Sequence, residues 1–397
     1  MIQIRDKSKC CGCEACSQIC PHNAIHMISD NEGFLYPHVD MNSCVDCGIC
    51  EKVCPYIGEV KTLSDKPLSY ACSSKNNALR ENSSSGGLFT IIADYVIDMG
   101  GVVFGARFDE NWCVSHTYVE KKSDIAIFRG SKYVQSKIGK SYIEARNFLK
   151  EGRMVLFTGT PCQILGLNKF LHRRYDNLIT VDVVCHSIPS PEVWGKYLKE
   201  LCGSRYKVSY VNFKDKHEGW DKYGLLIKVI DSFDNEKRIV RSSHKTNIYM
   251  RAFLTNLIAR PSCTNCPARN YVSGSDITLA DCWGFNTYHP ELNDNKGMNL
   301  ALLNTLKGIT LYRKLESTFF SLHIPFCEVE ENTNHLPLIK PAVQHYYRKQ
   351  FFKYYQKGYN VIDLMKKFVN KGERRKRIIS KAKQMARIFL PVHLLRR

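Results

Sequence analysis

The sequence contains no long hydrophobic run: among its 397 residues, no apolar stretch reaches the roughly 18 to 20 residues that a membrane-spanning helix needs. The first twenty residues also lack the charged, apolar and small-residue succession of a secretory signal. We therefore expect a cytoplasmic protein. A GxGxxG fingerprint is absent too, which disfavours a nicotinamide dinucleotide as the external redox carrier.

Cysteine, in contrast, is abundant, with 18 residues in the chain. In the cytoplasm, clustered cysteines bind metals or carry out redox chemistry more often than they form disulfides. A chain of this length can bury more than one core, so we expect two or three domains.

The formal net charge of +19 is concentrated at one end of the chain. Residues 335–397 contain 17 Lys and Arg but only two acidic residues, Asp363 and Glu373, and so supply +15 of the total. The remaining +4 would fall below zero with metal-bound thiolates and a flavin diphosphate, because a metal-bound cysteine is deprotonated. We therefore assign the basic character to a C-terminal appendage and do not expect nucleic acid as a partner. Binding of RNA or DNA by the tail is the alternative, and it would depend steeply on salt.

Two cysteine runs near the N-terminus share the pattern C-x2-C-x2-C-x3-C followed by proline. They are CCGCEACSQICP, residues 10–21, and CVDCGICEKVCP, residues 44–55. This is the signature of bacterial ferredoxins with two 4Fe-4S clusters, in which the fourth cysteine of each run ligates the other run's cluster. The sequence therefore predicts one cluster on Cys10, Cys13, Cys16 and Cys54, and a second on Cys44, Cys47, Cys50 and Cys20.

Zinc is the alternative metal for these runs, but the register of eight cysteines favours the two clusters. Cys11 lies outside the pattern, and we expect it not to be a ligand. The intervening GFLYPHVD, residues 33–40, alternates apolar and polar side chains, which predicts a short pair of strands.

A serine- and glycine-rich turn opens the next segment, SSSGGLFTIIADYVIDMGG, residues 83–101. Apolar residues follow the turn at helical spacing. A helix start of this kind leaves backbone N–H groups free to bind a phosphate. A plain helix cap is the alternative explanation of the same residues.

Predicted strands and helices then alternate, which favours a sheet with parallel strands and helical cover. Two of these strands end at Cys162 and Cys185, and ligands usually bind at the carboxyl ends of such strands. Further along, Cys263 and Cys266 in RPSCTNCPAR form half of a four-cysteine site. Together the four cysteines could hold a third cluster; alternatively, Cys162 and Cys185 are small buried residues.

Seven stretches, in this order, resemble the coenzyme F420 hydrogenase/dehydrogenase beta-subunit family over about residues 70 to 345. They are SSSGGLFT, FRGSKYVQS, LFTGTPCQI, VVCHSIPSP, RPSCTNCPAR, SDITLADCWG and NKGMNLALLNT. Members of that family are flavoproteins that hold FAD next to a 4Fe-4S cluster and pass electrons between a low-potential donor and a two-electron carrier. The resemblance favours the third cluster on Cys162, Cys185, Cys263 and Cys266.

The resemblance also implies a flavin pocket built from the serine-rich turn, the RGSKYVQS loop and a helix start. Its expected residues are Ser84, Ser85, Gly86, Gly87, Lys132, Tyr133, Gln135, Ser136 and Thr160. Lys132 would lie near the flavin or its diphosphate, where a positive charge favours the reduced anionic ring; on the residues alone it is a solvated lysine. His186 would be a proton donor at the flavin edge, or would simply hydrogen-bond at a turn.

One position departs from the family pattern. At LADCWG the family usually has glycine before the aspartate and a residue other than cysteine after it, whereas here Ala280 and Cys282 flank Asp281. Cys282 could therefore replace one ligand of the third cluster.

The predicted fold class is multidomain, α+β and α/β: a bacterial-type ferredoxin module with two 4Fe-4S clusters, followed by an α/β flavin-binding core with a mixed sheet. The predicted domains are a ferredoxin domain (1–62), an N-terminal flavin-binding domain (68–205), a C-terminal domain that completes the flavin and third-cluster sites (206–340) and a basic helical tail (341–397).

The predicted function is that of an iron-sulfur flavoprotein oxidoreductase. It would pass electrons between a ferredoxin or coenzyme F420 and a small-molecule substrate through the clusters and FAD, and the resemblance to bacterial relatives implies a place in surface-polysaccharide synthesis. The alternative is a non-catalytic electron-transfer beta subunit of a hydrogenase or dehydrogenase. In the tail, an apolar helical face amid basic residues predicts either attachment to an anionic membrane surface or a solvated terminal helix. That face consists of Ile378, Ala382, Met385 and Phe389.

Overall fold

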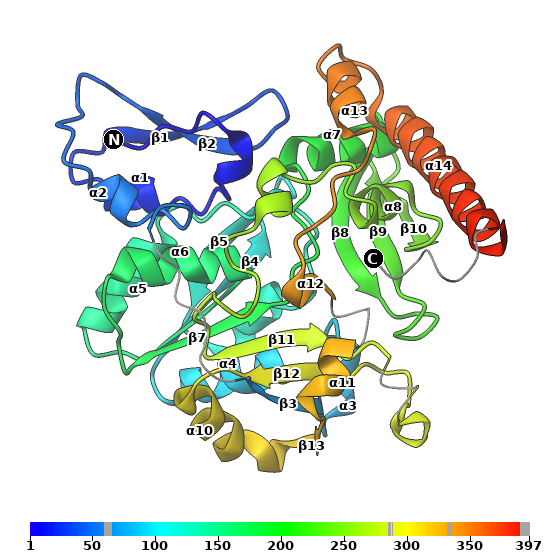
Figure 1. The fold of residues 1–397 in the computed structure, drawn as a ribbon. Helices are drawn as coiled ribbons and strands as arrows, with labels where there is room; N and C mark the ends of the chain where they lie inside the picture. Colours follow the sequence, from blue (N-terminus) through cyan, green and yellow to red (C-terminus); the bar gives the residue numbers. More distant parts are fainter. Residues whose placement is uncertain (59–65, 285–286, 288, 332–335, 390–397) are drawn as a thin grey trace.

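The computed structural model describes residues 1–58, 66–284, 287, 289–331 and 336–389 (Figure 1). An eight-stranded mixed sheet forms the centre of the described molecule, with strand order β13-β3-β12-β11-β7-β6-β4-β5. Its strands are β3 (Leu68–Ser74), β4 (Val102–Phe108), β5 (Val114–Val119), β6 (Val155–Gly159), β7 (Leu178–Val183), β11 (Ile277–Asp281), β12 (Asn299–Leu303) and β13 (Phe319–His323). The prediction of a core with a mixed sheet is confirmed.

The middle of this sheet is parallel and buried on both faces. Strands β11, β7, β6 and β4 pair in parallel, and the pairs toward both edges are antiparallel. Val103 packs in the core on one face, while its neighbours Val102 and Phe104 pack in the core on the other. Continuous apolar runs such as those of β4 and β6 are what a sheet covered by helices on both sides requires.

The helices cover both faces. Residues of α4 and α10 pack in the core that contains Val103, and residues of α5 and α6 pack in the core that contains Phe104. The helices are α1 (Ala15–Ile19), α2 (Ile49–Lys52), α3 (Asn77–Glu81), α4 (Leu88–Asp98), α5 (Ser141–Lys150), α6 (Pro161–Leu171), α7 (Pro191–Cys202), α8 (Ile248–Leu254), α10 (Leu306–Leu315), α11 (Phe326–Glu331), α12 (Leu336–Ile339), α13 (Arg348–Tyr355) and α14 (Val361–Phe389).

The N-terminal module contains the predicted strand pair, β1 (Ile25–Ser29) and β2 (Leu35–Val39), which is antiparallel. The module, blue in Figure 1, lies against α5 and α6, and Cys13, Ala15 and Val53 share a hydrophobic core with these helices. Gly166 of α6 permits the close approach, because a Cβ there would lie 2.8 Å from the Cβ of Cys13.

A second, three-stranded antiparallel sheet follows α7. It consists of β8 (Tyr206–Asp215), β9 (Gly224–Asp231) and β10 (Lys237–Ser243). After this sheet the chain returns to the central one, where β12 and β13 both pair with β3. The segment predicted as a separate domain, 206–340, therefore contributes to both sheets.

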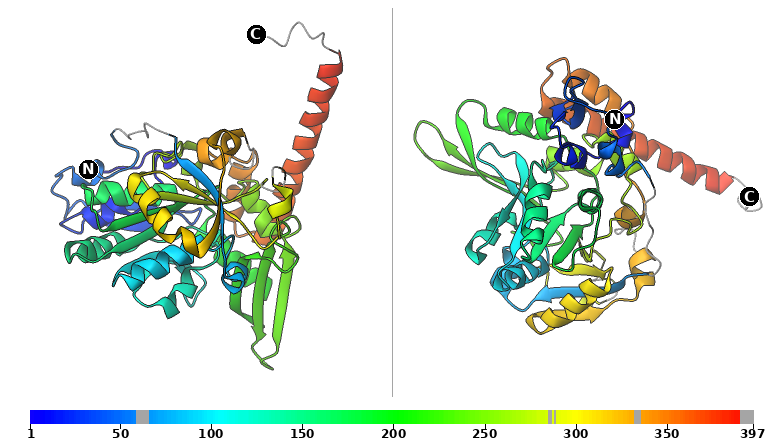
Figure 2. Two further views of the ribbon diagram at one scale, coloured as in Figure 1. Left: turned by 90° about the horizontal axis from the view of Figure 1, so that it is seen from below. Right: turned by 90° about the vertical axis from the view of Figure 1, so that its left-hand side faces the viewer.

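The predicted tail is helical, but its first part belongs to the core. Phe351, Phe352, Leu364 and Phe368 of α13 and α14 are buried in the same hydrophobic core as residues of α7 and α8. Beyond residue 372 the side chains of α14 through residue 381 are largely exposed, and the helix runs away from the body (Figure 2). Of the predicted apolar face, Ile378 is exposed; Ala382, Met385 and Phe389 lie outside the side chains that the structure describes.

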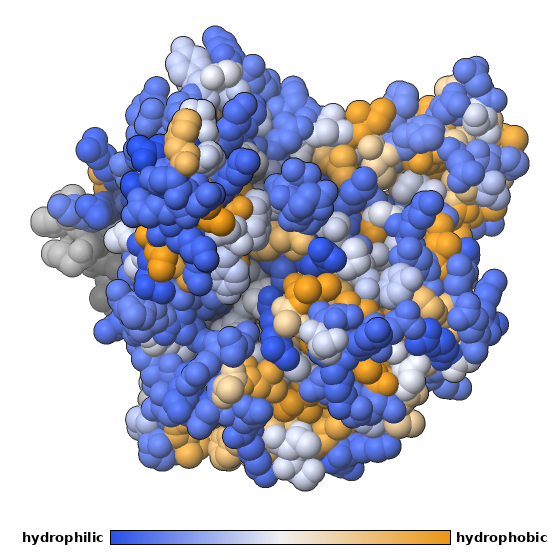
Figure 3. All heavy atoms as spheres, turned by 180° about the vertical axis from the view of Figure 1, so that it is seen from behind, coloured by the Kyte–Doolittle hydropathy of each residue, from blue (hydrophilic) through white to orange (hydrophobic). Residues whose placement is uncertain are grey.

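Within the described residues, no helix combines the length and apolar character needed to cross a bilayer. Most of the molecular face shown in Figure 3 is hydrophilic.

Candidate functional site

The two cysteine runs of the N-terminal module fold into matching turns. Gly12 and Glu14 in the first run have positive φ angles of 68° and 61°, and Asp46 and Gly48 at the equivalent places of the second have 50° and 71°. Two left-handed residues in each loop, two and four places after its first cysteine, curl the backbone so that the cysteines face a common centre.

The first cysteine set (Cys10, Cys13, Cys16 and Cys54) lines one cavity of the module. Burial raises the pKa of the Cys16 thiol, and the charges of Cys13, Cys10 and Cys54, followed by that of Cys50 in the second set, raise it further. The set therefore joins three cysteines of the first run to the last cysteine of the second, as the sequence predicts.

The second cysteine set (Cys20, Cys44, Cys47 and Cys50) lines a separate cavity of the same module. The Ile2 backbone N–H donates to Cys50 Sγ at 3.3 Å, and the Ala24 N–H donates to Cys20 Sγ at 3.4 Å. N–H···S hydrogen bonds of this kind accompany thiolates that ligate iron-sulfur clusters.

The third cysteine set (Cys162, Cys185, Cys263 and Cys266) comes together from three segments. Cys162 lies in the first turn of α6, just after β6, and Cys185 follows β7, so both lie at carboxyl ends of adjacent parallel strands. Cys263 and Cys266 arrive on the turn Pro261–Asn265 and the residue after it. Burial raises the pKa of Cys185, and the charges of the other three cysteines raise it further. The half-site of RPSCTNCPAR thus meets the two strand-end cysteines.

A single zinc ion would hold its thiolates about 3.8 Å apart, given Zn–S bonds of about 2.3 Å. Among the side chains that the structure describes, no three His, Cys, Asp or Glu are arranged to hold a single metal ion.

Of the six cysteines outside the three sets, two bear on the predicted ligands. Cys282 is buried among Trp220, Met298 and their neighbours, and its raised pKa reflects burial and the charge of Asp281 rather than of the third set. Cys11, by contrast, lies near the third set: interactions of its thiol with those of Cys13 and Cys162, together with burial, raise its pKa. Cys11 therefore lies between the first and third cysteine sets.

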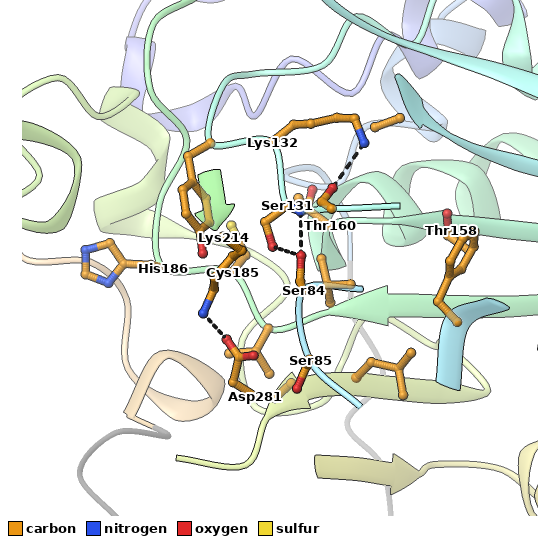
Figure 4. A pocket seen from close by; sticks show the side chains of 18 of the residues that line it. Ser84, Ser85, Ser131, Lys132, Thr158, Thr160, Cys185, His186, Lys214 and Asp281 are labelled. Carbon is orange, nitrogen blue, oxygen red and sulfur yellow. Dashed lines mark hydrogen bonds and ion pairs between the residues drawn. The ribbon is translucent and has the colours of Figure 1, made fainter. Parts of the chain in front are cut away.

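A cavity of about 510 Å³ opens beside the third set, within the range of cofactor sites. Its wall includes the ends of β6, β7 and β11 and the loops after α3 and before α5, and Cys185 belongs to it. Of the residues predicted for the flavin, seven line this cavity: Ser84, Ser85, Gly87, Lys132, Tyr133, Ser136 and Thr160 (Figure 4 labels four of them).

The other two predicted flavin residues lie behind the wall. A Cβ at Gly86 would stand 2.4 Å from the Cys72 carbonyl oxygen, so glycine there permits the turn to pass close to β3. The Gln135 amide faces the N-terminal module, where its Nε2 donates to the Cys11 carbonyl at 3.4 Å and its Oε1 accepts from Arg260.

The serine-rich turn and the RGSKYVQS loop are tied together in the wall. Ser131 donates to Ser84 Oγ from its backbone N–H at 2.7 Å (Figure 4), and Ser85 Oγ donates to the Met298 carbonyl at 2.6 Å. Thr160 Oγ1 lies 3.3 Å from Cys162 Sγ, which links the wall to the third set. The hydroxyl of Ser187 is buried with no hydrogen-bond partner among the described residues, and it lines the same cavity.

Lys132 is embedded in the loop rather than solvated. Its Nζ donates to the carbonyls of Phe128, Arg129 and Gly130 at 3.0 to 3.2 Å. Burial lowers the pKa of Lys132 to about 7.

Two histidines line the cavity. His116, which the sequence did not single out, is buried between Ser136 Oγ at 2.7 Å and the Thr158 carbonyl at 3.0 Å, and burial lowers its pKa to about 4. His186 Nε2 lies 3.2 Å from the Leu254 carbonyl, and burial lowers its pKa as well. Both rings are therefore neutral near pH 7.

A buried ion pair closes another side of the cavity. Lys214 Nζ lies 2.7 Å from Asp281 Oδ2 (Figure 4) and 3.8 Å from the centre of the Tyr223 ring. No motif in the sequence singles out Lys214, a charged residue in β8, because its position depends on the packing of the second sheet against β11.

Three family models match consecutive parts of the chain. The matching family is described as coenzyme F420 hydrogenase/dehydrogenase, beta subunit: residues 69–141 match the model of its N-terminal part, and residues 152–321 match the model of its C-terminal part. Residues 9–57 match the 4Fe-4S dicluster domain. No curated protein matches the chain.

A chain in a solved structure of the F420-reducing NiFe hydrogenase complex from Methanosarcina barkeri is similar at 15% identity. The similarity covers 79% of this chain and 92% of that chain, with a TM-score of 0.42. The two beta-subunit matches follow one another and together span more than half of the sequence. The chain therefore belongs to the coenzyme F420 hydrogenase/dehydrogenase beta-subunit family and carries a 4Fe-4S dicluster domain at its N-terminal side.

Proposed function

We propose that this protein is an iron-sulfur flavoprotein oxidoreductase with three 4Fe-4S clusters, one on each cysteine set, and FAD in the 510 Å³ cavity. It passes electrons between a low-potential carrier, ferredoxin or coenzyme F420, and a small-molecule substrate. The observation that carries the proposal is the double position of Cys185, which belongs to the third cysteine set and to the wall of the cavity.

The cysteine sets suit clusters in their chemistry. Each offers four thiol sulfurs, and each has at least one partner for them: Ile2 and Ala24 donate to sulfurs of the second set, Ile188 donates to Cys263 Sγ at 3.3 Å, and Arg260 lies near Cys10. Bound clusters would supply one-electron transfer.

The cavity suits a flavin in its size and in its polar groups. Its lining is largely apolar, with a few hydroxyls and one partnerless hydroxyl, Ser187, that a ligand could satisfy. A bound flavin would join the one-electron chemistry of the clusters to two-electron chemistry on a substrate.

The residues of the chain would position and polarise these groups. Lys132 lines the wall near the serine-rich turn, and a bound anionic flavin would favour its protonated form. His186 carries its ring proton on the nitrogen that faces the Leu254 carbonyl, so near pH 7 its other ring nitrogen would accept a proton rather than donate one. The buried Lys214 and Asp281 pair would face the substrate side.

Anaerobic reduction of the bound flavin tests the proposal. Wild-type protein should bind FAD, and dithionite-reduced ferredoxin should bleach the flavin absorbance. A C263A variant should retain the flavin but be reduced at least tenfold more slowly, while C327A, in which an exposed cysteine far from the three sets in sequence is replaced, should behave like the wild type. Protein that binds no flavin, or a C263A variant that is reduced as fast as wild type, would contradict the proposal.

The second candidate function is that of an electron-transfer subunit without a substrate of its own. Family membership favours it, because the family is named for the beta subunits of hydrogenases and dehydrogenases. Co-purification with a large catalytic subunit would support it, and turnover of a substrate by the isolated chain would exclude it.

A place in surface-polysaccharide synthesis and attachment to an anionic membrane surface complete the proposal. The exposed basic end of α14 supports the attachment, since it projects from the body (Figure 2). A pull-down with anionic liposomes, with and without residues 376–397, tests it; equal recovery of the two proteins would rule attachment out.

A further inference from the structure

Arg260 is a buried cation at the junction of the N-terminal module and the core. Only 1% of its surface is exposed. It immediately precedes the turn that carries Cys263, and it reaches into the module, where its Nε donates to the Cys10 carbonyl at 2.8 Å and its Nη2 donates to the Leu35 carbonyl at 2.8 Å. Arg260 therefore links the N-terminal module to the segment that carries two cysteines of the third set.

The guanidinium also approaches a sulfur of the first cysteine set. Arg260 Nη2 lies 3.6 Å from Cys10 Sγ, within hydrogen-bonding distance for sulfur. The guanidinium also lies close to the backbone of the first cysteine run, because a Cβ on Gly12 would stand 2.9 Å from Arg260 Nη1. Gly12 has a φ of +68° and no side chain, so the guanidinium can approach Cys10 at this point of the loop.

No carboxylate neutralises this charge in the described part of the chain. Arg260 has no ion pair within 4 Å there. The charge of Arg260 acts on the Glu14 carboxyl, but the two oxygens of Glu14 accept hydrogen bonds from the N–H groups of Ile138 and Gly139. The guanidinium instead contacts the carbonyls of Cys10 and Leu35, Gln135 Oε1 and the Cys10 sulfur, and its Cζ lies 4.3 Å from the centre of the Tyr36 ring. Because a buried cation without an ion pair is costly, negative charge on the neighbouring thiolates would stabilise it.

We propose that Arg260 is a positioning residue that raises the reduction potential of the centre held by the first cysteine set above that of the centre held by the second. This inference rests on the proposed function, since it assumes clusters on those sets. Net charge and hydrogen bonds to the sulfurs set the potentials of iron-sulfur clusters. A fixed cation next to Cys10 stabilises the reduced cluster, which carries one more negative charge than the oxidised one, and no corresponding arginine contacts the second set among the described residues.

The consequence is a bias in where a single electron resides. A centre of higher potential on the first set, which lies toward Cys11 and the third set, would retain an electron at the junction with the core rather than at the outer end of the module. No proton or other reactant is needed, because the electron comes from the low-potential carrier of the proposed function.

Redox titration followed by EPR tests the inference on the full chain, reconstituted anaerobically. In R260Q, which removes the charge, the potential of the first-set centre should fall by at least 59 mV, a tenfold change in the equilibrium for a one-electron couple. The second-set potential should stay within experimental error. A C47A variant, which removes a ligand of the second set, identifies the signals that belong to that set.

Two variants separate the charge from a purely structural effect. R260K keeps the charge but loses the planar fork, so it should lower thermal stability while shifting the potential by less than half as much as R260Q. R348Q is the matched control: Arg348 is also buried and ties the module to the core, but it pairs with Glu32 at 2.6 Å and contacts no cysteine. It should weaken docking and leave all potentials unchanged.

The outcomes distinguish this inference from the proposed function. Wild-type protein without iron-sulfur signals would overturn the proposed function. Intact signals whose potentials do not move in R260Q, or move equally in R260Q, R260K and R348Q, would overturn the inference about Arg260 and leave the proposed function standing.

Discussion

Replacing Gly166 by alanine should disturb the first cysteine set through the interface between α6 and the module. A Cβ at this position would lie 2.8 Å from Cys13 Cβ, 3.0 Å from Cys13 Sγ and 3.1 Å from the Tyr142 hydroxyl oxygen. Contacts that short force the backbone to shift, because Cys13 lies in a tight loop whose other cysteines are fixed around the same cavity.

The expected magnitude follows from two opposing effects. Alanine in a helix interior is favoured over glycine by about 1 kcal/mol, and overpacking of a close-packed site costs about 1 to 3 kcal/mol. G166A should therefore lower the free energy of unfolding by up to about 2 kcal/mol. Since the displaced residue is a predicted ligand, iron content should fall too.

Gly195 provides the matched control, because it also lies inside a helix, α7, and nothing stands within 4 Å of a Cβ built there. G195A should gain about 1 kcal/mol of stability from helix propensity alone and retain its full iron content. Thermal melting and iron analysis of both variants measure the contrast. A G166A protein that is as stable and as iron-rich as G195A would refute the docking of the module against α6.

Three further predictions test the third cysteine set, the cavity and the tail. C263A should reduce iron from about twelve to about eight per chain while the signals of the ferredoxin module persist; unchanged iron would place the third cluster elsewhere. Burial lowers the pKa of Lys132 from 10.5 to about 7. Between these pH values the unfolded chain binds more protons at this lysine than the folded chain does. The burial of Lys132 therefore lowers the free energy of unfolding by its full amount below pH 7 and by less as the pH rises. The stability of the flavin-free wild type should therefore rise relative to that of K132M between pH 7 and about pH 9, and a pH-independent difference would refute the burial of the ammonium. Removing residues 376–397 should leave the body folded, whereas removing 346–397 should cause aggregation because it uncovers the core face that Phe351 and Phe368 cover; similar behaviour of the two truncations would contradict the packing of α13 and α14.

The sequence predicts the module well because its information is local. Cysteine spacing and the left-handed turns at Gly12 and Gly48 act within a dozen residues, and they determine which sulfurs can share a centre. The exchange of Cys20 and Cys54 between the two runs follows from the same pattern, and both cavities show it.

The central sheet is predictable in class but not in order. Alternating strands and helices indicate a parallel centre, whereas the antiparallel pairing of β3 with β12 and β13 joins residues more than 200 positions apart. No turn or spacing in the sequence encodes such a pairing, because it depends on which edge of the sheet remains free. For this reason the sequence does not show that residues 206–340 contribute strands to both sheets.

The junction is the part least accessible from sequence. Cys11 falls outside the cysteine pattern, and the spacing in RPSCTNCPAR indicates a role for its cysteines and not for Arg260. The contacts of both residues form only when the module docks on the core. In the tail, the many basic residues draw attention away from four apolar residues that pack the first part of the segment into the core. They are Phe351, Phe352, Leu364 and Phe368.

Iron, sulfide and flavin analysis of anaerobically purified wild-type protein tests the central claim most directly. Three cubane clusters and one flavin site predict about twelve iron ions, about twelve sulfides and one FAD per chain. About eight iron ions without flavin would show that the third cysteine set and the adjoining cavity do not form the proposed redox site.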